Sequence, residues 1–235
     1  MNRDIIFPEK LELFLLSLRK EFGNYIVLRG YEFLPKGYSN DIDVFVNKRD
    51  LNRFFKCILN IKGINTNIKI IVSRLGLIKC ELHLDEEIIP FDILYGFYYF
   101  GLNYQNTKKL MLNTVLHESQ IFLIPHLSDE VRISLLKELL HNKRVRADKS
   151  KYLKEKIEDS FDELPTDFFL PEHIYEIKKS ISNKNLILPK LSRKLKIRLL
   201  ISNFSSYPFK SFYNIFLFIL IKYILKNSYH KYIIR

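Results

Sequence analysis

The sequence predicts an α+β protein, in which a mixed β-sheet flanked by helices is followed by an all-helical C-terminal region. Three observations lead to this prediction. Apolar runs of strand length crowd the first 126 residues, apolar residues at helical spacing dominate from residue 127 on, and 47% hydrophobic with 27% charged residues is an ordinary globular composition. The 235 residues are enough for two domains, which we expect at 1–126 and 127–235.

The first 126 residues should alternate helices and strands before three strands follow in succession. Apolar residues recur at helical spacing over 8–22, and Gly23 is a natural stop for that helix. Pro90 has no N–H to donate, so the last of the three strands should be an edge there or begin at Phe91. The expected elements are a helix at 8–22, strands at 25–28 and 41–46, a helix from 47 to about 60, strands at 67–73, 77–84 and 88–94, and a short strand at 121–124.

After Pro125 the pattern becomes helical. Ser128, Asp129 and Glu130 are typical of a helix N-terminus, and leucines follow them at helical spacing. Further helices are expected at about 149–161, 171–182, 192–202 and 209–234, the last with a break near Asn227.

Positive charge is concentrated in the second half. Residues 1–126 carry 16 Lys+Arg against 14 Asp+Glu, a net +2, whereas residues 127–235 carry 22 against 12, a net +10. No acidic residue follows Glu176. This region could dock on an anionic membrane surface, bind an anionic polymer such as RNA or an acidic glycan, or be a helical subdomain whose cations are simply solvated. Nucleic acid ranks behind the membrane, because no RNA-binding module is recognisable.

Cysteine usage and hydropathy predict a cytoplasmic protein. Cys57 and Cys80 are too few for a disulfide scaffold and are interpreted as reduced structural thiols. The N-terminus lacks the apolar run of a secretory signal, and the longest clean apolar run, 215–221, is far shorter than a membrane span needs. Peripheral attachment at the inner face of the membrane, through the basic helices, is the alternative location.

The chemistry of the chain is predicted from three aspartates. Asp41 and Asp43 are two residues apart in an expected strand, so they share one face, where their charges repel unless a cation lies between them. Asp92 is a lone acid in an apolar strand, which is an expensive place for a charge. Oxygen ligands favour Mg²⁺, and three carboxylates on neighbouring strands could hold two ions, with Mn²⁺ as an alternative. The plainer interpretation is that Asp41 is a turn residue at the entrance of a strand and that Asp43 is a solvated strand residue.

The context of the aspartates resembles a known signature. The strand Val27-Leu28-Arg29-Gly30 ends in a glycine, nine residues separate Tyr31 from Asp41, and Asp41-Ile42-Asp43-Val44 follows. This pattern resembles the nucleotidyltransferase signature of the DNA polymerase β-like superfamily, with Asp92 in the position of that superfamily's third acid. The resemblance covers residues 8–126 and implies a nucleotidyltransferase core. Within the superfamily, 28–35 and 135–141 are similar to stretches of uncharacterised bacterial nucleotidyltransferases often encoded beside surface-polysaccharide genes.

The resemblance implies a Mg²⁺-dependent transfer of a nucleoside monophosphate from an NTP to an acceptor hydroxyl, with release of pyrophosphate. The acceptor would be a small molecule or a glycan precursor in surface polysaccharide synthesis. Tyr31 stands where the superfamily has a second small residue, which indicates an altered donor site or an inactive enzyme. The implied catalytic and metal-binding residues are Asp41, Asp43 and Asp92, and the implied nucleotide-binding residues are Arg29, Gly30, Tyr31, Ser39 and Lys137.

Two other functions stay open at this point. A non-catalytic binding or scaffold protein could retain the fold, as Tyr31 suggests. A metal-dependent glycosyltransferase could use Asp41-x-Asp43 to bind a nucleotide sugar. The apolar run at 44–46 argues against the second alternative, because in glycosyltransferases such a pair normally ends its strand.

Overall fold

The computed structural model describes residues 6–38, 41–160, 169–182, 187–220 and 232–234. They are α+β in organisation and form two compact units. The first unit holds the described residues of Met1–Phe97, Thr107–Pro125 and Phe218–Arg235, and the second holds those of Tyr98–Asn106 and His126–Leu217. One junction therefore lies between Pro125 and His126, while the segment Tyr98–Asn106 belongs with the helical unit.

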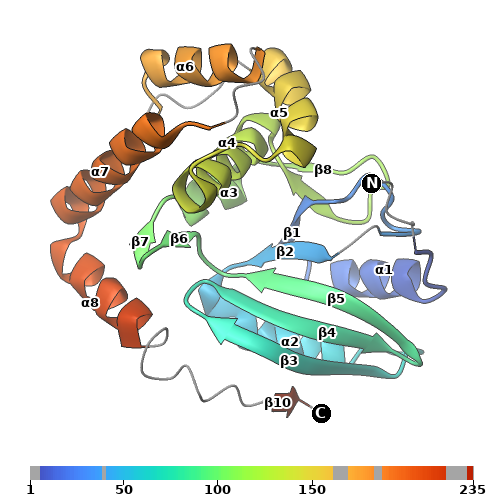
Figure 1. Cartoon of the computed structure of the whole chain (residues 1–235). Helices are drawn as coiled ribbons and strands as arrows, with labels where there is room; N and C mark the ends of the chain where they lie inside the picture. The colour runs from blue at the N-terminus through green and yellow to red at the C-terminus, as the bar shows by residue number, and fades with distance from the viewer. Residues whose placement is uncertain (1–5, 39–40, 161–168, 183–186, 221–231, 235) are drawn as a thin grey trace. The chain divides into compact units, whose positions relative to one another are not determined.

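A mixed β-sheet is the frame of the first unit (Figure 1). Its strands in the described residues are β1 Tyr25–Arg29, β2 Ile42–Val46, β3 Thr66–Arg74, β4 Leu77–Leu84, β5 Glu87–Leu94, β8 Thr114–Leu116, β9 Leu123–Pro125 and β10 Tyr232–Ile234. Their spatial order is β10-β3-β4-β5-β2-β1-β9-β8. The pairs β2–β5 and β1–β9 are parallel, and the other neighbours are antiparallel.

Helices α1 (Leu11–Glu21) and α2 (Leu51–Leu59) cover one face of this sheet. Their apolar sides meet the apolar side of the strands, and the Phe14 ring packs edge-on against Phe91 with 6.3 Å between centroids. A 3₁₀ turn at Lys48–Asp50 precedes α2, and the side chain of Asn47 caps it by accepting a hydrogen bond from the Arg49 N–H at 3.2 Å. Because the helices bury one face of the strands, polar residues at alternate strand positions lie on the other face.

Most of the elements expected in the first 126 residues are confirmed. Pro90 lies within β5, at a point where β5 pairs with β4 but has not yet reached β2, whose pairing begins at Phe91. The prediction of an edge at Pro90 is therefore correct, and the start at Phe91 is not needed. The sequence pattern missed four short elements: β6 (Tyr98–Tyr99), β7 (Leu102–Asn103), α3 (Thr107–Leu112) and β8.

The described residues of the second unit are mainly helical, with the β6–β7 hairpin and an isolated bridge between Arg144 and Ile187. Its helices are α4 Leu127–Lys137, α5 Ala147–Ser160, α6 Pro171–Ser182, α7 Pro189–Ser206 and α8 Pro208–Ile219, with a π-helical turn at Glu138–Asn142 after α4. Buried leucines and isoleucines of α4 to α7 form its core. None of the helices in the described residues combines the length and the apolar character needed to cross a bilayer.

The prediction of one helix over 209–234 is wrong at its end. Residues Tyr232–Ile234 form β10, which pairs antiparallel with β3 through Ile68, Lys69 and Ile70. Aromatic and β-branched residues favour a strand wherever a partner edge is within reach, and this edge is far away in the sequence. The break expected near Asn227 lies outside the described residues.

The contact between α1 and the sheet gives a test of this core. Phe14 is fully buried, so we expect Phe14→Ala to lower the free energy of unfolding by about 3–5 kcal/mol through lost burial and a residual cavity. Leu13→Ala is the matched control, because Leu13 is the neighbouring residue and is 43% exposed; its effect should stay within about 0.5 kcal/mol. Urea unfolding measures both, and equal effects would contradict the packing described.

Candidate metal centre

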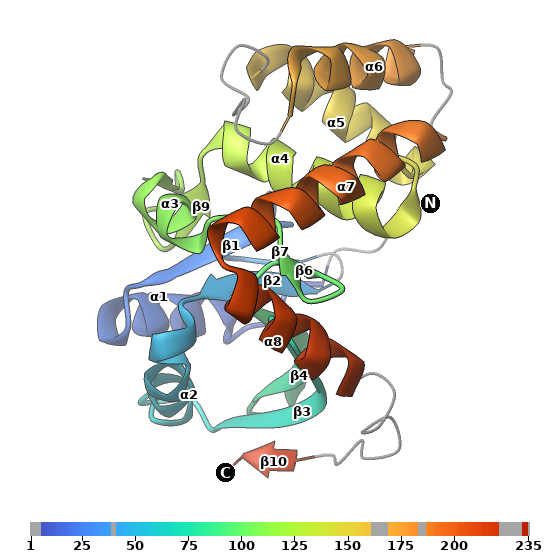
Figure 2. The ribbon, with the colours of Figure 1, turned by 90° about the vertical axis from the view of Figure 1, so that its left-hand side faces the viewer.

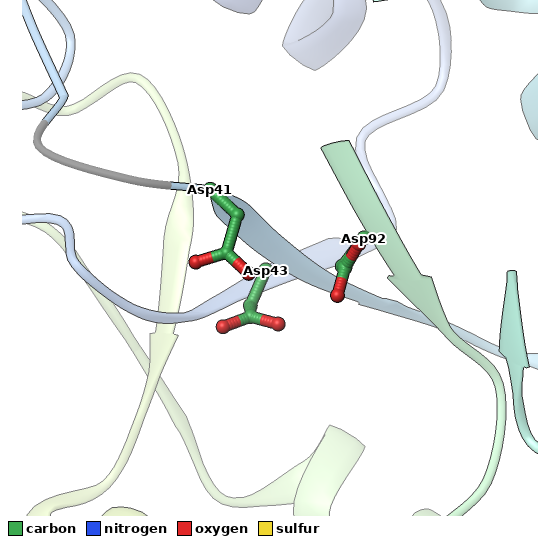
Figure 3. Close-up of side chains that lie close together, drawn as sticks. All are labelled: Asp41, Asp43 and Asp92. Atoms are coloured by element: carbon green, nitrogen blue, oxygen red, sulfur yellow. The ribbon is translucent and has the colours of Figure 1, made fainter. Parts of the chain in front are cut away.

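Three carboxylates lie close together near the middle of the sheet (Figure 3). Asp41 immediately precedes β2, Asp43 is the second residue of β2, and Asp92 lies in β5. The parallel register of β2 and β5 sets Asp43 directly opposite Asp92. Each of the three residues offers a carboxylate oxygen, and these oxygens lie within 4.8 Å of one another, which is a spacing that shared divalent cations can bridge.

The alternation of the two strands explains why the carboxylates share one face. Ile42 and Val44 on either side of Asp43 are buried in the core beneath the helices, as are Phe91 and Ile93 on either side of Asp92. Successive side chains of a strand point to opposite faces, so both aspartates must lie on the face away from α1 and α2. The apolar neighbours thus fix the position of the acids.

Burial makes this cluster electrostatically costly. Asp43 is only 4% exposed and Asp92 only 6%. Burial raises the pKa of the Asp92 carboxyl above its ordinary value, the hydrogen bond and charge of Lys79 oppose that shift, and the nearby charges of Asp43 and Asp41 reinforce it. A bound cation would offset both the burial and the repulsion.

Two basic side chains flank the acids in a row across four strands. Register pairs Lys79 of β4 with Asp92 of β5, and Arg29 of β1 with Asp43 of β2. The Lys79 Nζ lies 2.7 Å from Asp92 Oδ2, and the Arg29 Nε donates to Asp43 Oδ2. Burial lowers the pKa of the Arg29 guanidinium, but the carboxylates, Asp43 foremost, outweigh it and hold that pKa above its ordinary value.

The order across the four strands is therefore cation, acid, acid, cation, and Asp41 adds a further negative charge. The two basic side chains keep 42% (Lys79) and 32% (Arg29) of their area exposed, whereas their acidic partners are buried. The site thus combines a buried negative centre with partly exposed positive edges. A metal ion bound together with an anionic ligand such as a polyphosphate would complement this arrangement.

The loop after β1 begins with a backbone turn that only glycine adopts easily. Gly30 has a φ of +71°, which is a left-handed conformation that would strain other residues. Tyr31 follows, and its ring packs edge-on against the His117 ring with 5.6 Å between centroids. His117 in turn stacks on Phe122 at 4.5 Å. The side chain that replaces the expected small residue is therefore held by an aromatic cluster of the first unit.

The remaining predicted site residues fall elsewhere. Ser39 lies outside the described residues. Lys137 is half-buried in the last turn of α4, in the second unit, whereas the three aspartates belong to the first. Sequence reasoning missed Lys79, although a signal existed. The tight turn at Asp85-Glu86 pairs Leu84 with Glu87. Following the antiparallel register from that pair places Lys79 opposite Asp92.

Comparison of the chain with protein-family models, with curated proteins and with solved structures finds no match. The candidate site is therefore argued from its own geometry.

The raised pKa of Asp92 predicts a pH-dependent stability. Because the folded state holds this proton more tightly than the unfolded state, stability falls as the pH rises from the ordinary aspartate value, about 3.9, through the raised value. The Asp92→Asn variant has no carboxyl to deprotonate at this position. The difference in free energy of unfolding between this variant and wild type should therefore grow as the pH rises across this window and then level off. Urea unfolding at a series of pH values, with a chelator present, measures this difference.

The control for this titration is Glu86→Gln, which removes an exposed carboxylate in the β4–β5 turn. We expect this variant to leave the free energy of unfolding within about 0.5 kcal/mol of wild type, because Glu86 is exposed. A difference between Asp92→Asn and wild type that stays flat or falls with pH would contradict the assignment of the shift to the buried cluster.

Proposed function

We propose that the protein is a divalent-metal-dependent nucleotidyltransferase, which moves a nucleoside monophosphate from an NTP to an acceptor hydroxyl. The single observation that carries the proposal is the convergence of Asp41, Asp43 and Asp92, with carboxylate oxygens within 4.8 Å of one another. The glycine turn at Gly30 and the resemblance of its sequence context to the DNA polymerase β-like superfamily support the same function.

The donor set fits a hard divalent cation. All three candidate ligands are carboxylates, which favour Mg²⁺ or Mn²⁺ over softer metals. When bound, such a cation supplies neutralisation of phosphate charge and lowers the pKa of the attacking hydroxyl. Asp41, Asp43 and Asp92 would hold it, and their mutual repulsion in a buried place is the reason that the protein would bind it well.

The basic side chains at the rim would hold the nucleotide. Arg29 and Lys79 are partly exposed and lie at the two ends of the acidic pair, so they can meet phosphate oxygens without leaving the acids. The backbone of the loop that starts at Gly30 would add N–H donors, as tight glycine turns do for phosphates. This division of roles leaves recognition of the acceptor to other residues.

The reaction follows from these positions. The acceptor oxygen forms a bond to the α-phosphorus of the NTP. The bond between that phosphorus and the oxygen that bridges to the β-phosphorus breaks, and pyrophosphate departs with the electron pair. The acceptor proton passes to solvent water or to a carboxylate oxygen of the cluster that the cation would leave free. The protein chiefly supplies position and charge.

A non-catalytic nucleotide-binding or scaffold protein is the second candidate. One observation favours it, since Arg29 and Lys79 already form ion pairs with two of the three acids, as they would in a site that no longer binds metal. The glycosyltransferase alternative lacks such support, because the aspartate pair stands at the beginning of β2 and not at its end.

The test is pyrophosphate release from each common NTP with Mg²⁺, in the presence of candidate acceptor glycans and small alcohols. We expect Asp43→Asn to lower the rate by roughly 100-fold or more, because it removes charge that would stabilise the transition state. Thermal unfolding provides a second readout, since Mg²⁺-NTP at about 100 times its Kd adds about 2.7 kcal/mol to the stability of wild type.

Asp50→Asn is the matched control, because it makes the same chemical change at an acid outside the cluster and should leave both readouts unchanged. Stabilisation by Mg²⁺-NTP without pyrophosphate release would favour the scaffold. If wild-type protein showed neither stabilisation by Mg²⁺-NTP nor pyrophosphate release, both candidate functions would be contradicted.

A further inference from the structure

Helix α8 presents a row of largely exposed aromatic side chains. Phe212, Tyr213 and Phe216 follow Phe209 by three, four and seven residues, so the four side chains share one side of the helix, which we name the aromatic face. Their exposed fractions are 88%, 64%, 63% and 62%. Large exposed apolar patches are rare on soluble proteins, and where they occur they commonly mark interaction sites.

Contacts on the opposite side fix the rotation of α8. Ser211 is 3% exposed, and its hydroxyl lies within hydrogen-bonding distance of two carbonyl oxygens, that of Tyr207 at 2.8 Å and that of Asn203 at 3.0 Å. A Cβ placed on Gly101, in the β6–β7 turn, would come within 2.6 Å of the Asn214 carbonyl oxygen, so the backbone of α8 lies directly on that glycine. Turning the aromatic face inward would break these contacts.

Helix α7, which precedes α8 in the chain (Figure 2), also carries exposed apolar side chains. Ile197, Leu200 and Ile201 are exposed at helical spacing, and the exposed Arg193 lies one turn before them on the same side. The two helices are joined by an edge-on contact between the Phe204 and Phe212 rings at 4.8 Å. Apolar exposure thus extends over both helices rather than being confined to one residue.

Helices α7 and α8 themselves carry charge of a single sign, and one of their lysines, Lys194, pairs with Glu176 of α6 at 3.2 Å. No acidic residue follows Glu176 in the sequence, while exposed Lys190, Arg193 and Lys194 lie on α7 and exposed Lys210 on α8. The Lys210 Nζ lies 5.7 Å from the centroid of the Tyr207 ring, so a cation and an aromatic side chain are adjacent. An exposed aromatic face on helices that carry basic and no acidic residues is complementary to the interface of an anionic bilayer, where acyl chains lie beneath phosphate groups.

We propose that α7 and α8 dock on the surface of an anionic lipid bilayer. The aromatic face of α8 enters the region between headgroups and acyl chains, and the neighbouring lysines and arginines meet lipid phosphates. The twelve residues of α8 form a helix of about 18 Å, which is too short to span the hydrocarbon core and suits a helix that lies in the interface. Phe and Tyr are suited to this depth, because their rings tolerate the boundary between water and lipid.

The absence of tryptophan from the sequence makes a direct test available. In Phe216→Trp the single indole reports on the aromatic face, and we expect its emission to shift to the blue with vesicles that contain phosphatidylglycerol. Brominated acyl chains should quench it, and neutral phosphatidylcholine vesicles should give a much weaker response. Tyr175→Trp is the matched control, because Tyr175 lies on α6 of the same unit and is 65% exposed; its emission should not change.

Two further variants separate the apolar and the electrostatic contributions. In the Phe216→Trp background, Phe209→Ser should lower the vesicle partition coefficient roughly tenfold through lost apolar burial. Lys210→Gln should lower it about fivefold, which corresponds to about 1 kcal/mol for a basic residue near an anionic surface. Lys154→Gln, at an exposed position on α5, is the control and should have no effect. Circular dichroism checks that each variant is folded.

Three results would overturn the proposal. One is a Phe216→Trp spectrum that anionic vesicles leave unchanged in folded protein. Another is a blue shift that grows with protein concentration in the absence of lipid, which would mean that a second copy of the chain covers the aromatic face. The third is a blue shift produced by single-stranded RNA that vesicles cannot compete away.

Discussion

The placement of Asp43 beside Asp92 on adjacent parallel strands is the constraint on which the first unit depends. Two carboxylates that are almost fully removed from solvent repel each other and lose hydration, and neither cost is recovered by packing. Lys79 and Arg29 offset part of the cost, but Asp41 adds to it. Uncharged side chains of similar size would stabilise the same strands better, so the arrangement indicates chemistry rather than stability.

The rest of the sheet is arranged around this pair. The antiparallel β1–β2 pair brings Arg29 to Asp43, and the β4–β5 hairpin brings Lys79 to Asp92. The chain must pass through α2, β3 and β4 before β5 can lie parallel to β2, and that crossover leaves α2 beside α1 on the far face.

The sequence predicted features that depend on local periodicity and missed those that depend on distant partners. Asp41 and Asp43 share a face by the two-residue period of a strand, and Asp92 was identified as an acid among apolar neighbours. The contact of Tyr31 with His117 joins residues far apart in the chain, so no local pattern indicates it. β10 was predicted as helix for the same reason, because the edge of β3 that it pairs with is distant in sequence.

The charge carried by α7 and α8 bears on the acceptor. The chain after Glu176 contains no acidic residue, and Lys194 of α7 pairs with Glu176 of α6. The surplus of positive charge on α7 and α8 can meet an external anion, and the aromatic face of α8 gives a reason to prefer lipid over water. Docking at a membrane does not help an enzyme to meet a freely dissolved acceptor. It raises the local concentration of acceptors carried at that membrane, so the two proposals together favour a hydroxyl on a membrane-associated molecule.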